Sequence, residues 1–180
     1  MTEYRKVFID TAPIIYYLQK SDLYFTKMKS IFLYLLQSDS IFITSDITVA
    51  EYLVYPYREK KEDLEIAFDE FIRCSHTEIV HTSEMIAKKA AKIRAEYHGF
   101  KAMDAFQLAV AEMSNCTLFI TNDKQLRQYR GMRCMLIDDI ADQVLKEELS
   151  DPFYSEENMK RLEESIKQIE QTGGTIHEVD

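Results

Sequence analysis

Short runs of β-branched and aromatic residues alternate with longer amphipathic stretches along the first 140 residues, and this alternation constrains the fold most strongly. The runs are 5–10 (RKVFID), 40–46 (SIFITSD), 78–81 (EIVH), 116–123 (CTLFITND) and 133–138 (RCMLID). Because strands that alternate with helices are joined by crossover connections, the pattern favours parallel strands. The sequence therefore predicts an α/β fold whose mostly parallel sheet has helices on both faces.

Helix boundaries follow from apolar spacing and capping residues. Helices are predicted over 22–37, 49–57, 62–73, 83–98 and 101–115. Asp46 or Thr48 is expected to cap the helix over 49–57, and Pro56 to kink it or stop it early. Gly99 is expected to end the helix over 83–98, since glycine suits the left-handed position after a helix. The 101–115 segment is apolar almost all round and is predicted to be a buried helix.

The composition predicts one folded domain with an acidic appendage. A chain of 180 residues with 46% hydrophobic and 29% charged residues is typical of a compact globular protein. We place a boundary after residue 141, which gives a main domain over 1–141 and an acidic helical tail over 142–180. The tail holds 11 acidic and 4 basic residues, and so carries most of the net charge of -9. The main domain is nearly neutral, and nucleic acid is not excluded as a substrate.

The sequence also indicates a compartment. No apolar run approaches the roughly 18 residues that span a bilayer, and charges occupy the place of a signal peptide's apolar stretch. We therefore expect a cytoplasmic protein with no membrane association. An odd number of scattered cysteines is unlike a disulfide framework, and we expect Cys74, Cys116 and Cys134 to be reduced packing residues. The four histidines have no ligand-like spacing, so no zinc site is predicted.

Four acidic residues stand at positions that suggest chemistry. Asp10 ends the first run, and Glu51 lies in the helix after the second. Asp104 interrupts the apolar helix over 101–115, and Asp123 follows the fourth run. Each has an ordinary alternative as a turn acid, a solvated helix acid or a helix cap, but Asp104 fits such a role poorly. Because the carboxyl ends of parallel strands meet at one edge of a sheet, we expect the four acids to converge.

Clustered carboxylates indicate a divalent cation. They repel one another and raise each other's pKa unless a cation neutralises them, and Mg²⁺ or Mn²⁺ prefers such hard oxygen ligands. A cation held this way assists phosphodiester hydrolysis. Thr11, Thr121 and Asn122 follow the same runs and supply polar groups that can orient an acid or a water molecule.

Four segments together resemble the acidic motifs of PIN-domain ribonucleases. They are FIDTAPIIYYL (8–18), ITSDITVAEYL (43–53), KAMDAFQLAVA (101–111) and LFITNDKQL (118–126), in the family's order. Within that family the chain is most similar to VapC-like toxins of prokaryotic toxin–antitoxin pairs. The resemblance implies a PIN-like fold and an Mg²⁺-dependent or Mn²⁺-dependent endoribonuclease with an RNA substrate, an antitoxin partner and a homodimeric state.

The resemblance also assigns roles to individual residues. Asp10, Glu51, Asp104 and Asp123 would hold the metal, and Thr121 would support them as a catalytic polar residue. Many relatives have Ser or Asn where this chain has Ala12, so the resemblance does not extend to the supporting contact at that position, while the metal site is less affected.

Basic residues near the motifs suggest an RNA path. Lys124, Arg127, Arg130 and Arg133 follow the fourth acid and either contact RNA phosphates or form a solvated surface. Arg58, Lys60 and Lys61 form a second patch with the same two interpretations.

The tail has an amphipathic pattern of its own. Residues 155–180 place apolar side chains at helical spacing, namely Met159, Leu162, Ile166 and Ile169. The segment resembles the toxin-binding end of some small antitoxins. We therefore interpret it as an inhibitor that masks the site in its own or a neighbouring subunit; the alternatives are a packing extension and a surface helix.

Two other function classes compete with the nuclease. One is a catalytically silent PIN-like module that binds RNA or protein; the four acids argue against it, because a binding module has no need for a repulsive cluster. The other is a phosphatase or phospho-receiver of similar topology, which lacks support because residues 10–12 contain no aspartate pair.

Overall fold

The computed structural model describes the backbone of residues 4–150 and the side chains of residues 4–144. The chain divides into two compact units, Met1–Ala141 and Asp142–Asp180. The amphipathic segment 155–180 lies outside the described residues, so its helical conformation stays a prediction. Within residues 4–150, no helix has both the length and the apolar character needed to cross a membrane.

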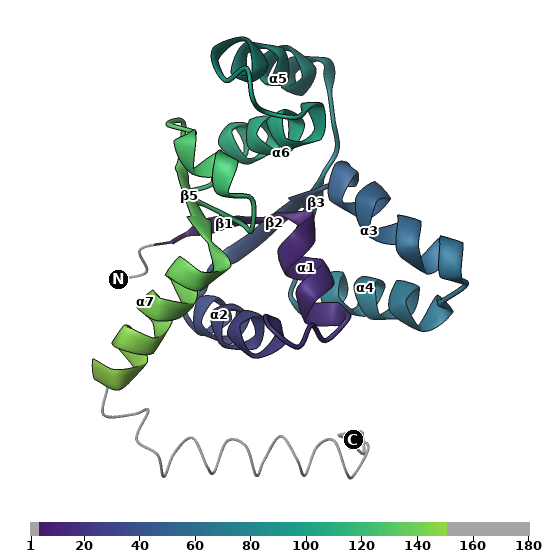
Figure 1. Ribbon diagram of the computed structural model, residues 1–180, viewed down its shortest axis with the longest axis vertical. Helices are drawn as coiled ribbons and strands as arrows, with labels where there is room; N and C mark the ends of the chain where they lie inside the picture. The colour runs from purple at the N-terminus through teal and green to yellow at the C-terminus, as the bar shows by residue number, and fades with distance from the viewer. Residues whose placement is uncertain (1–3, 151–180) are drawn as a thin grey trace, which may run out of the picture. The chain divides into compact units, whose positions relative to one another are not determined.

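A five-stranded parallel sheet forms the centre of the first unit (Figure 1). Its strands are β1 (Lys6–Ile9), β2 (Ile41–Ser45), β3 (Glu78–Val80), β4 (Leu118–Thr121) and β5 (Arg133–Leu136), in the spatial order β3-β2-β1-β4-β5. Phe8 on β1 aligns with Ile43 on β2 and with Phe119 on β4. Every pairing is parallel, so the predicted α/β fold is confirmed. The carboxyl ends of β1, β2 and β4 therefore share one edge.

Helices cover both faces of this sheet. They are α1 (Thr11–Leu18), α2 (Phe25–Gln37), α3 (Asp46–Glu59), α4 (Glu62–Cys74), α5 (Glu84–Glu96), α6 (Ala102–Met113) and α7 (Ile137–Ser150), with a 3₁₀ helix η1 (Lys124–Gln128). In Figure 1, α5 and α6 lie on one side of the sheet, and α1 and α2 lie on the other. Consecutive residues of β1 are buried, as expected for strands with helices on both faces.

The core is centred on the middle strands. Phe8 and Phe119 stack with ring centroids 4.8 Å apart, and Leu108 of α6 is fully buried. The α6 segment is buried along most of its length, as its apolar composition predicts, although Met103 remains exposed. This packing fixes α6 against the sheet, and with it the position of the acid in its first turn.

Several local predictions were wrong. Helix α3 begins at Asp46 with Ser45 as its N-cap, and it continues past the buried Pro56 to Glu59. Helix α5 ends at Glu96, and no left-handed conformation occurs at Gly99. Tyr97 is the C-cap of α5, and its ring stacks on Phe100.

Cys74 also departs from its prediction. Its side chain is exposed near the end of α4, whereas Cys116 is buried and Cys134 is half-buried. Cys74 is therefore an accessible thiol rather than a packing residue. The pKa of both Cys116 and Cys134 is raised to about 12 by burial.

Candidate functional site

Asp10 lies at the carboxyl edge of the sheet, between β1 and α1. One of its carboxylate oxygens accepts a hydrogen bond from the Thr11 backbone N–H at 2.7 Å, which makes Asp10 the N-cap of α1. The other oxygen accepts a bond of 2.6 Å from the Thr121 hydroxyl at the end of β4. The Thr121 hydroxyl also accepts a bond of 3.0 Å from the Asp123 backbone N–H. A buried threonine thus links the first and fourth acids.

Glu51 reaches the same region from α3. Its Oε2 accepts a bond of 2.5 Å from the Thr11 hydroxyl and one of 3.0 Å from the Gln107 side-chain amide. Gln107 also donates to the Thr11 hydroxyl at 3.2 Å. These contacts connect α1, α3 and α6 around one carboxylate oxygen.

Sequence reasoning missed Gln107. The side chain is only 2% exposed, and its amide oxygen has no hydrogen-bond partner. The signal was present in the sequence: Gln107 follows Asp104 by three residues, and residues at that spacing share one face of a helix. A second polar residue on the face of Asp104 marks the side of α6 that meets the acids.

Asp104 lies in the first turn of α6 and Asp123 after β4. Asp104 Oδ2 is buried and has no hydrogen-bond partner. Burial is the main cause that raises the pKa of Asp104, and the negative charges of Asp123 and Glu51 raise it further, while Lys101 lowers it. Asp123 is the N-cap of η1 and accepts a bond of 2.8 Å from the Gln125 backbone N–H. Asp123 therefore has the capping role that its position suggested.

Electrostatic coupling joins the four acids. Burial raises the pKa of Asp10 to about 6; the hydrogen bonds from Thr121 and Thr11 oppose this rise, and the charges of Glu51 and Asp104 add to it. Asp104 is in turn coupled to Asp123. The acids that sequence reasoning selected therefore share one region of negative potential.

The donor chemistry of this region suits a hard divalent cation. No three carboxylate, imidazole or thiol groups in the described part of the chain lie close enough together, as placed, to share one ion. However, Asp104 Oδ2 is a buried carboxylate oxygen without a proton donor, and a cation would satisfy it. A cation would also relieve the repulsion on Asp10. The residues therefore fit Mg²⁺ or Mn²⁺ in their chemistry.

The remaining polar and basic residues are distributed unevenly. The Asn122 side chain donates to the Tyr16 hydroxyl at 3.3 Å rather than to an acid. Arg127 forms an ion pair with Asp139. Arg133 aligns with Leu118 at the start of β4, so it lies at the amino edge of the sheet, away from the acids. Of its two interpretations, the structure favours the solvated surface, because Arg133 is exposed and β5 runs parallel to β4.

The other basic residues remain exposed. Lys124 and Arg130 lie on either end of the η1 region. Arg58, Lys60 and Lys61 lie around the end of α3, and the Lys61 ammonium is 5.6 Å from the centre of the Tyr55 ring. Their contact with RNA stays a prediction.

Comparison with known proteins decides the family. The PIN domain model matches residues 7–132 of this chain. The chain belongs to the PIN domain family. A comparison with curated proteins gives no match.

Solved structures of other PIN-like proteins share this fold. VapBC2 from Rickettsia felis, solved with a DNA fragment from its promoter, has a chain that is 20% identical, with a TM-score of 0.59, and the match covers 73% of this chain and 98% of that one. A toxin–antitoxin complex from Klebsiella pneumoniae has a chain that is 24% identical, with a TM-score of 0.53, and the match covers 70% of this chain and 94% of that one. VapC20 from Mycobacterium tuberculosis is described as a sarcin–ricin loop cleaving toxin. It is 16% identical, with a TM-score of 0.54, and the match covers 71% of this chain and 98% of that one. At these identities the likeness concerns the PIN fold alone.

Proposed function

We propose that this PIN-domain protein is a metal-dependent endoribonuclease that acts as the toxin of a toxin–antitoxin pair. One observation carries the proposal. Asp10 is buried and has a raised pKa, and one Asp104 oxygen has no hydrogen-bond partner. Both acids lie near other negatively charged side chains at one edge of the sheet. Such a cluster is unfavourable without a cation, and perturbed carboxylates gather at functional sites. The solved toxins of the same fold, one of them described as cleaving the sarcin–ricin loop, support the choice of RNA.

The proposed site assigns a task to each residue. Asp10, Glu51, Asp104 and Asp123 hold the divalent ion. The chemistry that Mg²⁺ or Mn²⁺ supplies at such a site is Lewis-acid polarisation of a phosphodiester bond. Hydrolysis adds a water oxygen to phosphorus and breaks the bond to the leaving ribose oxygen, which takes up a proton.

Hydrogen bonds position two of the proposed ligands. The Thr121 hydroxyl fixes one Asp10 oxygen, and Thr11 with Gln107 fixes one Glu51 oxygen. Each carboxylate thereby keeps its orientation. Both Asp10 oxygens accept one hydrogen bond each, so a cation would bind at their remaining lone pairs. Thr121 is a supporting residue in this proposal, because its hydroxyl acts through Asp10.

The partners follow from the same proposal. RNA binds to the nearly neutral main domain, where Lys124 and Arg130 are exposed near Asp123. The protein acts in the cytoplasm as a homodimer with an antitoxin partner. Its own acidic tail, residues 155–180, inhibits the site, because a segment rich in carboxylates repels the RNA backbone.

Cleavage of a mixed RNA pool tests the nuclease. The full chain is compared with Asp104→Asn and with Asp69→Asn, a matched control whose side chain is exposed on α4. We expect cleavage that requires Mg²⁺ or Mn²⁺, stops with chelator, falls at least about a hundredfold in Asp104→Asn and persists in Asp69→Asn. Equal cleavage by the parent and Asp104→Asn would reject the mechanism.

The alternative is a catalytically silent PIN-like module that binds RNA or protein. It is favoured by one observation: among the described side chains, no three candidate ligands are already close enough to share an ion. The same assay separates the two functions. A silent module retains RNA or protein binding but gives no metal-dependent cleavage, whether or not the tail is mutated.

A further inference from the structure

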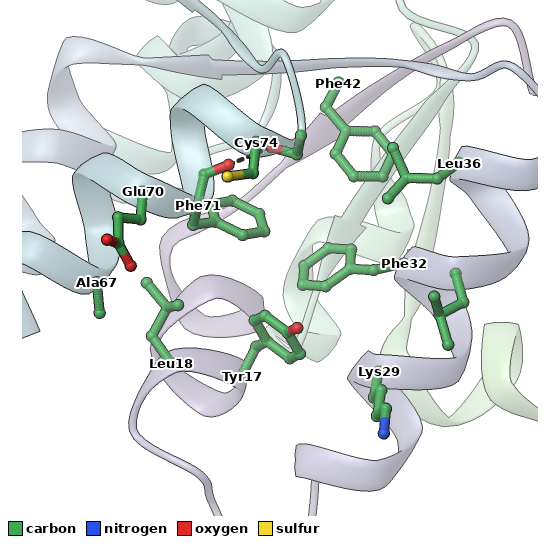
Figure 2. Close-up of a pocket in the computed structure, with 12 residues that line it drawn as sticks. Tyr17, Leu18, Lys29, Phe32, Leu36, Phe42, Ala67, Glu70, Phe71 and Cys74 are labelled. Carbon is green, nitrogen blue, oxygen red and sulfur yellow. Dashed lines mark hydrogen bonds between the residues drawn. The ribbon is translucent and has the colours of Figure 1, made fainter. Parts of the chain in front are cut away.

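A polar hollow lies between the end of α5 and the last residues of η1. It has a volume of about 760 Å³ and is lined by Glu96, Tyr97, Arg127, Gln128 and Arg130. Unlike the apolar cleft between α1, α2 and α4 that Figure 2 shows, it is lined mainly by charged and amide side chains. Its volume is within the range of sites that bind small ligands. We call it the α5–η1 hollow.

Both walls of the α5–η1 hollow lead to the acids. Asp123 is the N-cap of η1 and Gln128 is its last residue, so about 10 Å of 3₁₀ helix separates the two. On the other wall, the Tyr97 ring stacks on Phe100 with centroids 4.8 Å apart, and Phe100 precedes Asp104 by four residues. Successive nucleotides of a strand are about 3.4 Å apart along its axis, so RNA held at the acids reaches the hollow within about three nucleotides.

Buried contacts fix the wall that residues 128–131 form. The Tyr129 hydroxyl donates a hydrogen bond to Glu112 of α6, and Glu112 forms an ion pair with Lys89 of α5. A Cβ at Gly131 would lie 2.5 Å from the Tyr129 hydroxyl and 2.7 Å from the Glu112 carboxylate, so glycine is required where the chain passes these groups. The shape of this wall therefore does not depend on a ligand.

Arg130 is held at the hollow through its backbone. Its N–H donates a hydrogen bond of 3.1 Å to the Tyr97 hydroxyl, which joins the two walls. Its side chain is exposed, and none of the ion pairs among residues 4–144 involves it. The second cation, Arg127, pairs with Asp139 at the surface, where such pairs contribute little and a phosphate can compete.

We propose that the α5–η1 hollow binds the RNA strand on one side of the scissile bond, with Arg130 on a phosphate and Gln128 on a base edge. A guanidinium donates hydrogen bonds in a planar fork that matches phosphate oxygens. The Gln128 amide can both donate to and accept from a base, and Glu96 can accept from a base amino group. This inference rests on the proposed nuclease function and names residues that hold its substrate away from the acids.

Binding of a short single-stranded RNA of random sequence tests the hollow without cleavage. Fluorescence anisotropy is measured on the full chain, with chelator, across a salt series. Arg130→Gln is compared with Arg73→Gln, a matched control exposed on α4 outside the hollow. We expect Arg130→Gln to weaken binding about fivefold and to reduce the slope of log affinity against log salt by about 0.7, the value of one phosphate contact. Arg73→Gln should match the parent.

Two further variants separate a direct contact from a structural role. Arg130→Lys keeps the charge, so it should restore the salt slope while recovering only part of the affinity, because an ammonium lacks the planar fork. Gln128→Ala should weaken binding without changing the slope, since an amide carries no charge. Both side chains are exposed, so the circular dichroism spectrum should be unchanged in every variant.

The place of the hollow along the strand is tested on an RNA that the parent cleaves. This RNA is shortened step by step from each end. Arg130→Gln should raise KM about fivefold with an unchanged kcat when the RNA extends more than about three nucleotides beyond the scissile bond on one side. The variant should match the parent on RNA trimmed closer than that on the same side.

Three results would overturn the proposal. Arg130→Gln could bind RNA as tightly as a parent that cleaves it, and the nuclease would then stand without the hollow. Equal losses in Arg130→Gln and Arg73→Gln would mean that net charge alone attracts RNA. A parent that binds no RNA would also refute the hollow as an RNA site. By contrast, RNA binding that depends on Arg130 in a parent without cleavage would refute the nuclease and support the hollow.

Discussion

Replacing Asp10 with Asn is expected to stabilise the metal-free protein at neutral pH. The pKa of Asp10 rises from its ordinary value of 3.8 to about 6, mainly through burial. Above both values the charged form costs the folded state up to about 3 kcal/mol. Asn has nearly the same shape, keeps an acceptor for the Thr11 N–H and can donate to the Thr121 hydroxyl. For a chain of this size the melting temperature would rise by up to about 6–12 °C.

The pH dependence identifies the cause of this stabilisation. Between about pH 4 and pH 6 the folded protein binds more protons at Asp10 than the unfolded chain does, so this group's contribution to stability falls as the pH rises. The gain from Asp10→Asn should be near zero at pH 4 and largest above pH 6.5. Raising the pH should therefore widen the gap between parent and variant.

Urea denaturation at several pH values, in the presence of chelator, measures this gap. Asp69→Asn is the matched control, because it makes the same substitution at an exposed side chain away from the acids. Adding Mg²⁺ should then stabilise the parent and leave Asp10→Asn nearly unchanged. A variant that is less stable than the parent at pH 7.5, or a gain that is equal at every pH, would refute this account of Asp10.

Other substitutions test neighbouring contacts. Thr121→Val removes a hydrogen bond that lowers the pKa of Asp10, so the acidic limb of a pH–rate profile should move to higher pH; an unchanged profile would contradict this. Gln107→Leu removes a donor to Glu51 and should reduce RNA cleavage about tenfold with an unchanged circular dichroism spectrum. Phe119→Ala should lower the free energy of unfolding by about 3–5 kcal/mol in urea titrations, because Phe119 is fully buried against Phe8.

The arrangement of the acids was predictable because it depends on topology. Once the strands are parallel, the ends of β1 and β4 share an edge of the sheet. Because the two strands are also neighbours, Asp10 and Asp123 follow adjacent strand ends. The contact between Thr121 and Asp10 follows from the same register. Sequence reasoning also anticipated the capping function of Asp123, since capping is local chemistry.

Features that depend on tertiary packing were not predictable. Pro56 was expected to kink α3 or to stop it early, and the early stop was wrong, because Pro56 is buried within the helix and α3 continues to Glu59. Arg133 follows Asp123 by only ten residues, yet β5 begins at the opposite edge of the sheet. Tyr17 and Phe71 line the same apolar cleft between α1, α2 and α4, and their rings are in contact. Because the two residues are far apart in the sequence, no local sequence pattern predicts the cleft.

Stability and activity together distinguish a working site from a structural cluster of acids. Acids kept for structure form hydrogen bonds that are lost on substitution, and their replacement destabilises the fold. Asp104 instead has a buried oxygen without a partner and a pKa raised mainly by burial. Asp104→Asn should therefore abolish cleavage and, without metal, leave the protein at least as stable as the parent at neutral pH. If this variant were both inactive and clearly less stable, its inactivity would not identify Asp104 as a metal ligand, and the cluster would be structural.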